Sequence, residues 1–344
     1  MLRVSKKRAM EPRCRKSYNR RMISARLLTA LLLASAVPSI LGAQVLPKAA
    51  PARQMVILDT DIGDDIDDAF ALALVLRCPE LQLLGVETAF GDTELRARLV
   101  DRYLAAVGRS DVPVLAGVST ANTNFTQAAY ARQSPPRKHA AAVSFLLAQA
   151  RAHPGQITLI AIGPLFNIQA AIARDPVTFK KLKRVVIMGG SVYRGYDNHN
   201  GISTNAPPSP EWNILCDPAG ARALFASGVP VFVMPLDSTQ IHLQLPMLGT
   251  ILSHGSPLTD QLTLLYHQWT GATEWHSPTL FDPVAVTFTI RPDLCPVKPM
   301  RLEVSDEGFT RPAEGAPNVQ VCLHSNENGF LQLLVGRLVG EPTH

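Results

Sequence analysis

The stretch Val56-Ile-Leu-Asp-Thr-Asp-Ile-Gly-Asp-Asp-Ile-Asp-Asp-Ala-Phe-Ala-Leu72 joins an apolar run to six carboxylates that lie within residues 59–68. The apolar run at 55–58 is typical of a buried strand, and a helical pattern follows the acids. So many like charges repel one another unless a cation lies among them, and Ca²⁺ takes about six to eight oxygen ligands. Because open α/β folds bind ligands at the carboxyl edge of their sheet, the stretch predicts a metal site at such an edge.

Other interpretations of the stretch explain less of it. Acids that complement a helix dipole account for Asp65 and Asp67, but not for Asp59 and Asp61 at the end of a strand. An EF-hand loop needs Gly at its sixth position and a helix before it, whereas Gly63 is fifth and follows a strand. A phosphotransferase with an aspartate nucleophile also begins with strand-Asp-x-Asp, so it stays an alternative, although Gly63 is unusual there.

Residues 1–43 are predicted to be a secretory signal segment. Arg20 and Arg21 precede the apolar run 27–36, and the small residue Ala43 ends the segment. The run is short for a membrane span and Pro38 follows it, so we expect an exported, periplasmic or secreted protein without a stable membrane anchor. Residues 44–344 are then predicted to form one domain.

The charge of the chain changes when that segment is set aside. The segment holds ten of the 33 basic residues and one of the 28 acidic ones, so the overall net charge of +5 becomes about −4. The remainder has no basic stripe with interleaved aromatic residues. Nucleic acid is therefore not an expected partner.

Short apolar runs alternate with helical patterns along the chain, which is typical of βαβ units and a parallel sheet. The fold class predicted is α/β, Rossmann-like, with a mostly parallel central sheet flanked by helices. The predicted strands are 55–60, 81–89, 157–162, 184–189, 229–234, 299–304 and 319–323; the predicted helices are 67–77, 93–107, 138–152, 165–174, 217–227, 257–271, 282–290 and 326–339. Residues 118–137 and 194–211 are expected to be long loops.

Four cysteines follow the signal segment, and none of them forms a C-x-x-C pair. Zinc and thioredoxin-like chemistry are therefore not indicated. In an oxidising compartment Cys295 and Cys322 are able to pair, but the sequence does not decide this, and buried free thiols are the more ordinary interpretation.

Four motifs in order carry a resemblance to a known family. They are the Asp cluster at 59–68, Ile162-Gly-Pro-Leu-Phe-Asn167, Met188-Gly-Gly with the later Pro210-Glu-Trp-Asn-Ile214, and Phe281-Asp-Pro-Val-Ala285. Together they resemble the inosine-uridine-preferring nucleoside hydrolases over residues 55–340. The resemblance implies the fold of that family, homo-oligomers (dimers or tetramers), and Ca²⁺-dependent hydrolysis of ribonucleosides to free base and ribose.

The resemblance also implies roles for single residues. Asp61 would bind Ca²⁺ and act as the general base on the attacking water, with Asp68, Asp282 and the Ile162 carbonyl as further ligands. Asp59 is expected to converge on the same ion. The substrate-binding residues, which would hold the ribose of a small-molecule nucleoside, are implied to be Asp67, Asp92, Asn205, Glu211 and Asn213.

The chain departs from the family pattern at three places. Asp64 and Asp65 are an insertion, because three residues rather than one separate Gly63 from the Asp pair. Asp92 stands where Asn is usual, and Phe281 replaces the His that often assists the leaving base. The leaving-group acid is then unassigned, and we predict His276, just upstream, as the catalytic candidate.

These departures keep alternatives open. The first alternative keeps the fold and the reaction type, and is hydrolysis of another ribosyl compound. Two alternatives belong to other functional classes: a non-catalytic periplasmic ribonucleoside-binding protein and the phosphotransferase named above. The chemistry favours hydrolysis, since carboxylates stabilise an oxocarbenium-like transition state.

Overall fold

The computed structural model describes residues 52–121, 125–197 and 205–340. The predicted signal segment 1–43 lies outside them. The chain divides into two units, and the second, from Ala50 onward, holds all of the described residues. No helix of the described ranges is long and apolar enough to cross a bilayer.

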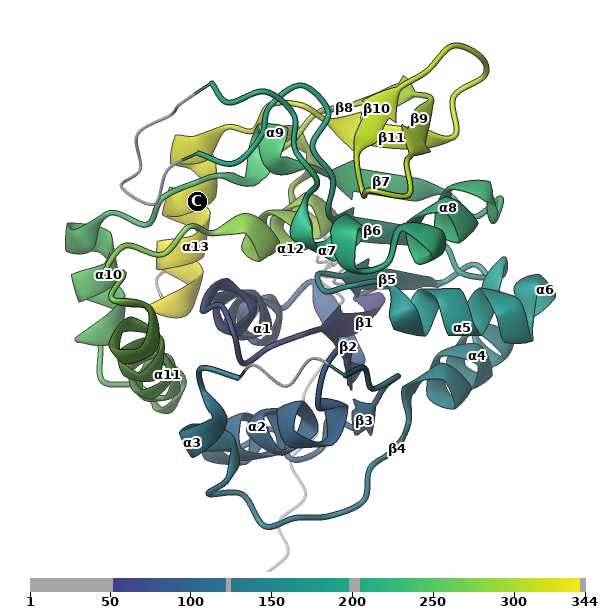
Figure 1. Ribbon diagram of the computed structural model, residues 1–344. Helices are drawn as coiled ribbons and strands as arrows, with labels where there is room; N and C mark the ends of the chain where they lie inside the picture. The colour runs from purple at the N-terminus through teal and green to yellow at the C-terminus, as the bar shows by residue number, and fades with distance from the viewer. Residues whose placement is uncertain (1–51, 122–124, 198–204, 341–344) are drawn as a thin grey trace, which may run out of the picture. The chain divides into compact units, whose positions relative to one another are not determined.

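A mostly parallel sheet forms the centre of this unit (Figure 1). Its described strands stand in the order β4-β3-β2-β1-β5-β6-β7-β11-β8, and all neighbours are parallel except β11 and β8. The α/β fold predicted from the sequence is confirmed. The strands are β1 (Gln54–Thr60), β2 (Leu81–Thr88), β3 (Val114–Ala116), β4 (Ala140–Ala141), β5 (Ile157–Ala161), β6 (Arg184–Met188), β7 (Val231–Met234), β8 (Val297–Met300) and β11 (Val319–Cys322).

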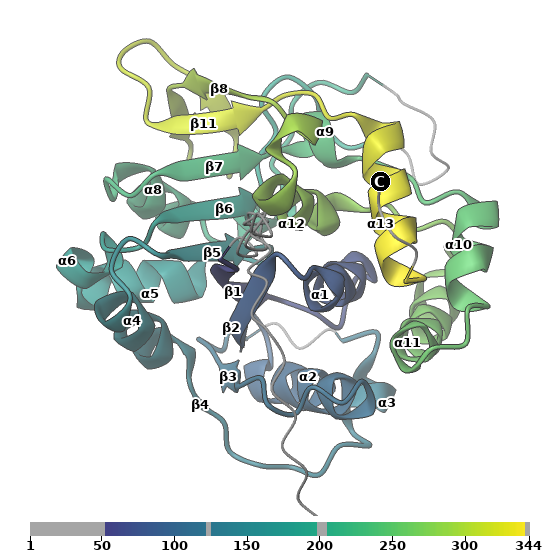
Figure 2. The ribbon, with the colours of Figure 1, turned by 180° about the vertical axis from the view of Figure 1, so that it is seen from behind.

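Helices cover both faces of the sheet (Figures 1 and 2). Strand side chains alternate between the faces, so Val56 and Leu58 pack into one core, while Ile57 packs into the other. The first face carries α1 (Asp67–Arg77), α2 (Thr93–Ala106), α10 (Leu245–Leu252), α11 (Pro257–Thr273), α12 (Phe281–Ile290) and α13 (Glu327–Leu338); the second carries α4 (Ala142–Ala152), α5 (Phe166–Arg174), α6 (Pro176–Phe179) and α8 (Pro218–Ala226).

Two sequence-based expectations about local structure were wrong. The strand expected at 299–304 is two strands, because β8 pairs with β11 while β9 (Leu302–Val304) pairs with β10 (Thr310–Pro312) in a separate two-stranded sheet. The loop expected at 118–137 contains the short helix α3 (Ala128–Ala131). Further elements were not expected: β3, β4 (which lies inside the helix expected at 138–152), α6, α10, α7 (Trp212–Cys216), α9 (Leu236–Thr239) and the 3₁₀ turn Pro292–Leu294.

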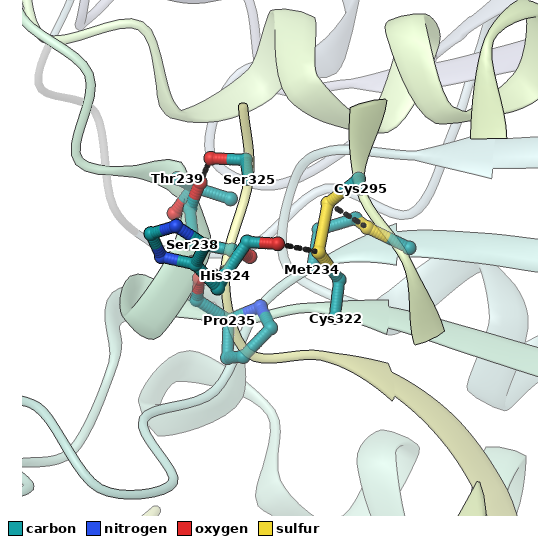
Figure 3. The surroundings of a disulfide bond; sticks show 8 residues. All are labelled: Met234, Pro235, Ser238, Thr239, Cys295, Cys322, His324 and Ser325. Atoms are coloured by element: carbon teal, nitrogen blue, oxygen red, sulfur yellow. Dashed lines mark hydrogen bonds between the residues drawn. A yellow bond between two sulfur atoms is a disulfide. The ribbon is translucent and has the colours of Figure 1, made fainter. Parts of the chain in front are cut away.

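A disulfide joins Cys295 to Cys322 across a sequence separation of 27 residues (Figure 3). The free-thiol interpretation is therefore wrong for this pair, whereas Cys78 and Cys216 are free thiols. Just beyond the bond, the Ser325 hydroxyl donates to the Ser238 carbonyl at 2.6 Å. The C-terminal strand β11 is in this way attached to the segment that follows β7.

Removing this disulfide should destabilise the protein. A cross-link over a loop of this length contributes about 3 kcal/mol by restricting the unfolded chain. The double variant Cys295→Ala/Cys322→Ala should lower the free energy of unfolding by about that amount in urea titrations. Cys216→Ser, at a half-buried free thiol, is the control. An unchanged midpoint in the double variant would show that the bond does not form.

Candidate functional site

The site lies where the order of the strands reverses. From β1 the chain proceeds to β2, β3 and β4 on one side, then returns to place β5 on the other side of β1. Such a switch point opens a crevice at the carboxyl ends of the two strands. Asp61 follows the end of β1 and Ile162 follows the end of β5. The topology therefore positions these two residues at the crevice.

A cavity of about 150 Å³ occupies this position. Seven of the residues predicted for the site line it: Asp61, Asp67, Asp68, Ile162, Glu211, Asn213 and Asp282. Asp64, Asp65, Met188, Tyr196, Trp212 and Phe281 complete the wall. Residues from the two ends of the chain thus share one small space.

Three carboxylates form the core of the cavity. Oxygens of Asp67, Asp68 and Asp282 lie within 4.8 Å of one another, and the three side chains are buried. Asp67 and Asp68 begin α1, while Asp282 is in the first turn of α12 and its backbone N–H donates to Asp67 at 3.1 Å. Burial, followed by repulsion from Asp67, Asp68 and then Asp61, raises the pKa of Asp282 well above its ordinary value.

Asp61 faces the same cluster, and Arg96 partly balances its charge. Burial raises the pKa of Asp61 to about 6, although the nearby Arg96 acts against this. Arg96 is itself buried on α2 and donates to the backbone carbonyls of Asp61 and Ile62 and to the Asp64 carboxylate at 2.5 Å. One guanidinium therefore holds three residues of the loop that follows β1, and no motif in the sequence pointed to it.

Two glycines allow the loop to pack this closely. A Cβ at Gly163 would lie 2.8 Å from both the backbone nitrogen and the Oδ1 of Asp61. Gly63 has φ of +128°, and a Cβ there would meet the ring of Phe125 at 2.4 Å. Gly63 therefore requires glycine because L side chains rarely adopt such a φ, and Gly163 requires it because a Cβ would collide with Asp61.

The opposite wall is built around Glu211 and Asn213. The Glu211 carboxylate caps α7 by accepting from the backbone N–H groups of Asn213 at 2.9 Å and Ile214 at 3.2 Å, and it also accepts from Gly190 at 2.9 Å. Burial raises the pKa of Glu211 to about 7. The Asn213 amide donates to the carbonyls of Ile162 at 3.0 Å and Met188 at 3.1 Å. Both side chains are therefore fixed at the cavity wall.

The chemistry of these groups fits a hard divalent cation. Four buried carboxylates repel one another, which a cation would relieve, and the donors predicted to hold it are all oxygen. Asp61, Asp68, Asp282 and the Ile162 carbonyl are the residues predicted to hold it. The structure adds Asp67, which the sequence analysis assigned to the ribose, to the group that is close enough for an ion.

Asp59 is not among the residues that line the cavity. It is still inside β1, and the Asn167 amide on α5 holds its carboxylate at 2.6 Å. Its neighbour across the sheet is the fully buried Glu87, and burial raises the pKa of Asp59 to about 7. The predicted ligand role of Asp59 therefore finds no support in its placement.

Three other predicted residues also lie away from the cavity wall. Asp92 is exposed and caps α2 by accepting from the Leu95 backbone N–H at 3.0 Å. Asn205 is exposed, with φ of +47°. His276 is exposed, and its carbonyl accepts from the Tyr266 hydroxyl at 2.8 Å. Their roles stay predictions, and these positions do not support them.

Aromatic residues at the rim were missed by the sequence analysis. Tyr196 and Trp212 line the cavity, and the Trp212 backbone N–H donates to the Tyr196 hydroxyl at 2.9 Å. Tyr196 also meets the ring of Phe281 edge-on at 6.2 Å between centroids. One indication of their role was present in the sequence, namely that Tyr196 lies within the loop expected at 194–211 and Trp212 directly follows it.

Comparison with known proteins agrees with this geometry. The model of the inosine-uridine preferring nucleoside hydrolase family matches residues 56–332. The chain belongs to this family. It is 30% identical to the non-specific ribonucleoside hydrolase RihC of Escherichia coli O157:H7 (strain EC4115 / EHEC), over 81% of this chain and 96% of RihC.

Two further relatives agree with that membership. Uridine nucleosidase 1 of Arabidopsis thaliana is 29% identical, over 75% of this chain and 80% of its own length. The solved structure of a plant nucleoside hydrolase, PpNRh1, superposes with a TM-score of 0.72 and 26% identity, covering 83% of this chain and 99% of PpNRh1. Membership of this family makes the chain an N-glycosyl hydrolase by class.

The metal-free protein should be stabilised by removing one repelling carboxylate. Because the pKa of Asp61 is raised from 3.8 to about 6, the folded state binds an extra proton between these values and loses stability as the pH rises through them. Asp61→Asn removes this cost, so it should raise the free energy of unfolding by on the order of 3 kcal/mol at pH 8 and by much less near pH 4.

Urea unfolding with a chelator present measures this difference, and Asp306→Asn, at an exposed carboxylate, is the control. A divalent ion that binds the cluster should reverse the order at pH 8, since wild type would then gain the binding free energy. An Asp61→Asn variant less stable than wild type without metal would contradict the repulsion described above.

Proposed function

We propose that this protein hydrolyses the N-glycosidic bond of ribonucleosides and releases free base and ribose, with Ca²⁺ in the carboxylate cluster. The observation that carries the proposal is the set of three buried carboxylates within 4.8 Å, beside Asp61, at the switch point of the sheet. Family membership supports the reaction class, and the donor set supports a hard cation.

The proposed ligands of the ion are the carboxylates of Asp61, Asp68 and Asp282 and the carbonyl of Ile162. When bound, Ca²⁺ would hold ribose hydroxyls and lower the pKa of the attacking water. The Asn213 amide keeps the Ile162 carbonyl in place through the hydrogen bond at 3.0 Å. Arg96 keeps the Asp61 backbone in place from the other side.

The side chains of this protein would then perform the remaining steps. Asp61 would accept the proton of the attacking water as general base. Positive charge that develops on the sugar would be stabilised by the surrounding carboxylates, which are fixed before the reaction starts. Asp67, Glu211 and Asn213 would bind the ribose hydroxyls, since all three line the cavity.

Asp61→Asn should abolish hydrolysis while the protein still folds. General base help contributes roughly 10²–10⁴-fold, and the loss of a ligand would add to that. The measurement is release of reducing sugar from inosine, uridine, adenosine, cytidine and p-nitrophenyl riboside in the presence of Ca²⁺. Asp282→Asn should lose both activity and the Ca²⁺-induced rise in melting temperature.

The same panel tests the alternatives. Tight binding of nucleosides without ribose release by wild type would identify a binding protein, and release of phosphate from phosphomonoesters would identify a phosphotransferase. Turnover of p-nitrophenyl riboside without turnover of the four natural nucleosides would indicate a different ribosyl substrate. The replacement of the usual His by Phe281 favours that outcome among the alternatives.

Residues 1–43 are proposed to direct export to the periplasm or outside the cell, and the Cys295–Cys322 disulfide is consistent with an oxidising compartment. Fusing 1–43 to a reporter enzyme that is active only after export should give activity, and replacing Leu31 and Leu32 by Arg should abolish it. An active reporter in the arginine variant would contradict the proposal.

A homo-oligomer, dimer or tetramer, is likewise proposed.

A further inference from the structure

Two more cavities adjoin the one that contains the carboxylate cluster. One, of about 330 Å³, shares Asp64, Asp65 and Trp212 with it. Another, of about 190 Å³, shares Asp65, Tyr196 and Phe281 with it. The inserted Asp65 borders all three. A ribose held at the cluster would therefore place its base in these adjoining spaces, which we call the base compartment.

The chain has three tryptophans, and all of them line the larger space of the base compartment. Trp269 is buried on α11 and meets Trp275 edge-on at 6.2 Å, while Trp212 is 47% exposed at the rim. Stacked or edge-on aromatic walls hold flat rings well, and the faces of tryptophan also attract cations. The compartment is thus suited to a flat, positively charged ring.

The charge of the cavity walls also favours a positively charged ring. The cluster cavity alone is lined by seven carboxylates, and among the described residues that line the three cavities there is no Lys or Arg. Arg96 is already engaged by Asp64 at 2.5 Å. One divalent ion and one arginine would still leave an excess of negative charge, which raises the local concentration of cations.

The way in which the base leaves also favours a positively charged ring. A neutral nucleobase is a poor leaving group unless an acid protonates it, and general acid help is worth roughly 10²–10⁴-fold. Phe281 stands beside Asp282, where the family often has a histidine, and His276 is exposed. His242 lines the 190 Å³ space and not the cluster cavity. A base with a fixed positive charge requires no such acid.

We propose that the preferred substrates are ribonucleosides whose base carries a fixed positive charge, as in N-ribosyl pyridinium compounds and N7-alkylated purine ribosides. This deepens the proposed function and rests on it. In the reaction the C1′–N bond breaks and both electrons pass to the nitrogen, which neutralises the ring. The oxygen of water bonds to C1′, and its proton passes to Asp61.

The test compares 7-methylinosine with inosine, which differ by one methyl group and one charge. Because the cation is intrinsically more reactive, the decisive quantity is how the ratio of the two kcat/KM values changes among variants. Asp65→Asn should lower the ratio about tenfold, and Trp275→Leu should lower it severalfold. Asp306→Asn, a remote exposed carboxylate, should leave it unchanged. A ratio that stays the same in Asp65→Asn would overturn the proposal.

A binding measurement provides a second readout that does not need turnover. In the Ca²⁺-loaded protein, 1-methylnicotinamide, whose ring nitrogen carries a fixed positive charge, should quench the fluorescence of the compartment's tryptophans. Its half-saturating concentration should be at least tenfold lower than that of neutral nicotinamide. Asp65→Asn keeps all three tryptophans and should remove most of this difference. Equal binding of the two compounds by wild type would overturn the proposal.

The two proposals fail differently. If no riboside of any charge releases ribose, the proposed hydrolysis is wrong, while the fluorescence comparison still tests the cation preference. If inosine is hydrolysed but Asp65→Asn affects the two substrates equally, the hydrolase stands and the charge preference is wrong.

Discussion

Mutual repulsion among buried carboxylates is the constraint on which the rest of this structure depends. Asp61, Asp67, Asp68 and Asp282 come from both ends of the chain and are enclosed in one cavity, where burial and repulsion raise their pKa values. Such an arrangement costs free energy until a cation enters it. The scaffold around the site therefore has to hold the acids together against their own charge, and several of its features do this.

Arg96 and the helix N-termini provide that support. The guanidinium of Arg96 binds the backbone and the Asp64 side chain of the loop after β1. Asp67, Asp68 and Asp282 stand in the first turns of α1 and α12, where the helix dipole favours negative charge. These interactions reduce the repulsion among the carboxylates but do not cancel it. The remaining negative charge favours the binding of a divalent ion.

The insertion Asp64-Asp65 connects this electrostatic design to the base compartment. Asp64 is held by Arg96, whereas the Asp65 carboxylate accepts from the Ile66 backbone N–H at 2.7 Å and borders all three cavities. The same two residues therefore stabilise the loop and shape the space beside the carboxylate cluster. In the sequence the insertion adds only negative charge, whereas in the structure it lines both the carboxylate cavity and the cavities beside it.

Hydrophobic periodicity and motifs of neighbouring residues are local signals, and they predicted the parallel α/β fold with its main strands and helices. The family resemblance that those motifs carry implied seven of the cavity residues. The sequence did not reveal Arg96 or the grouping of the three tryptophans, since their contacts join residues far apart in the chain, such as Trp212 and Trp269 around one cavity. The disulfide was also left undecided, because pairing depends on the distance between two cysteines in space. Asp59, Asp92, Asn205 and His276 were also predicted for the site, but burial against Asn167 or exposure to solvent, which only packing decides, kept them from the cavity wall.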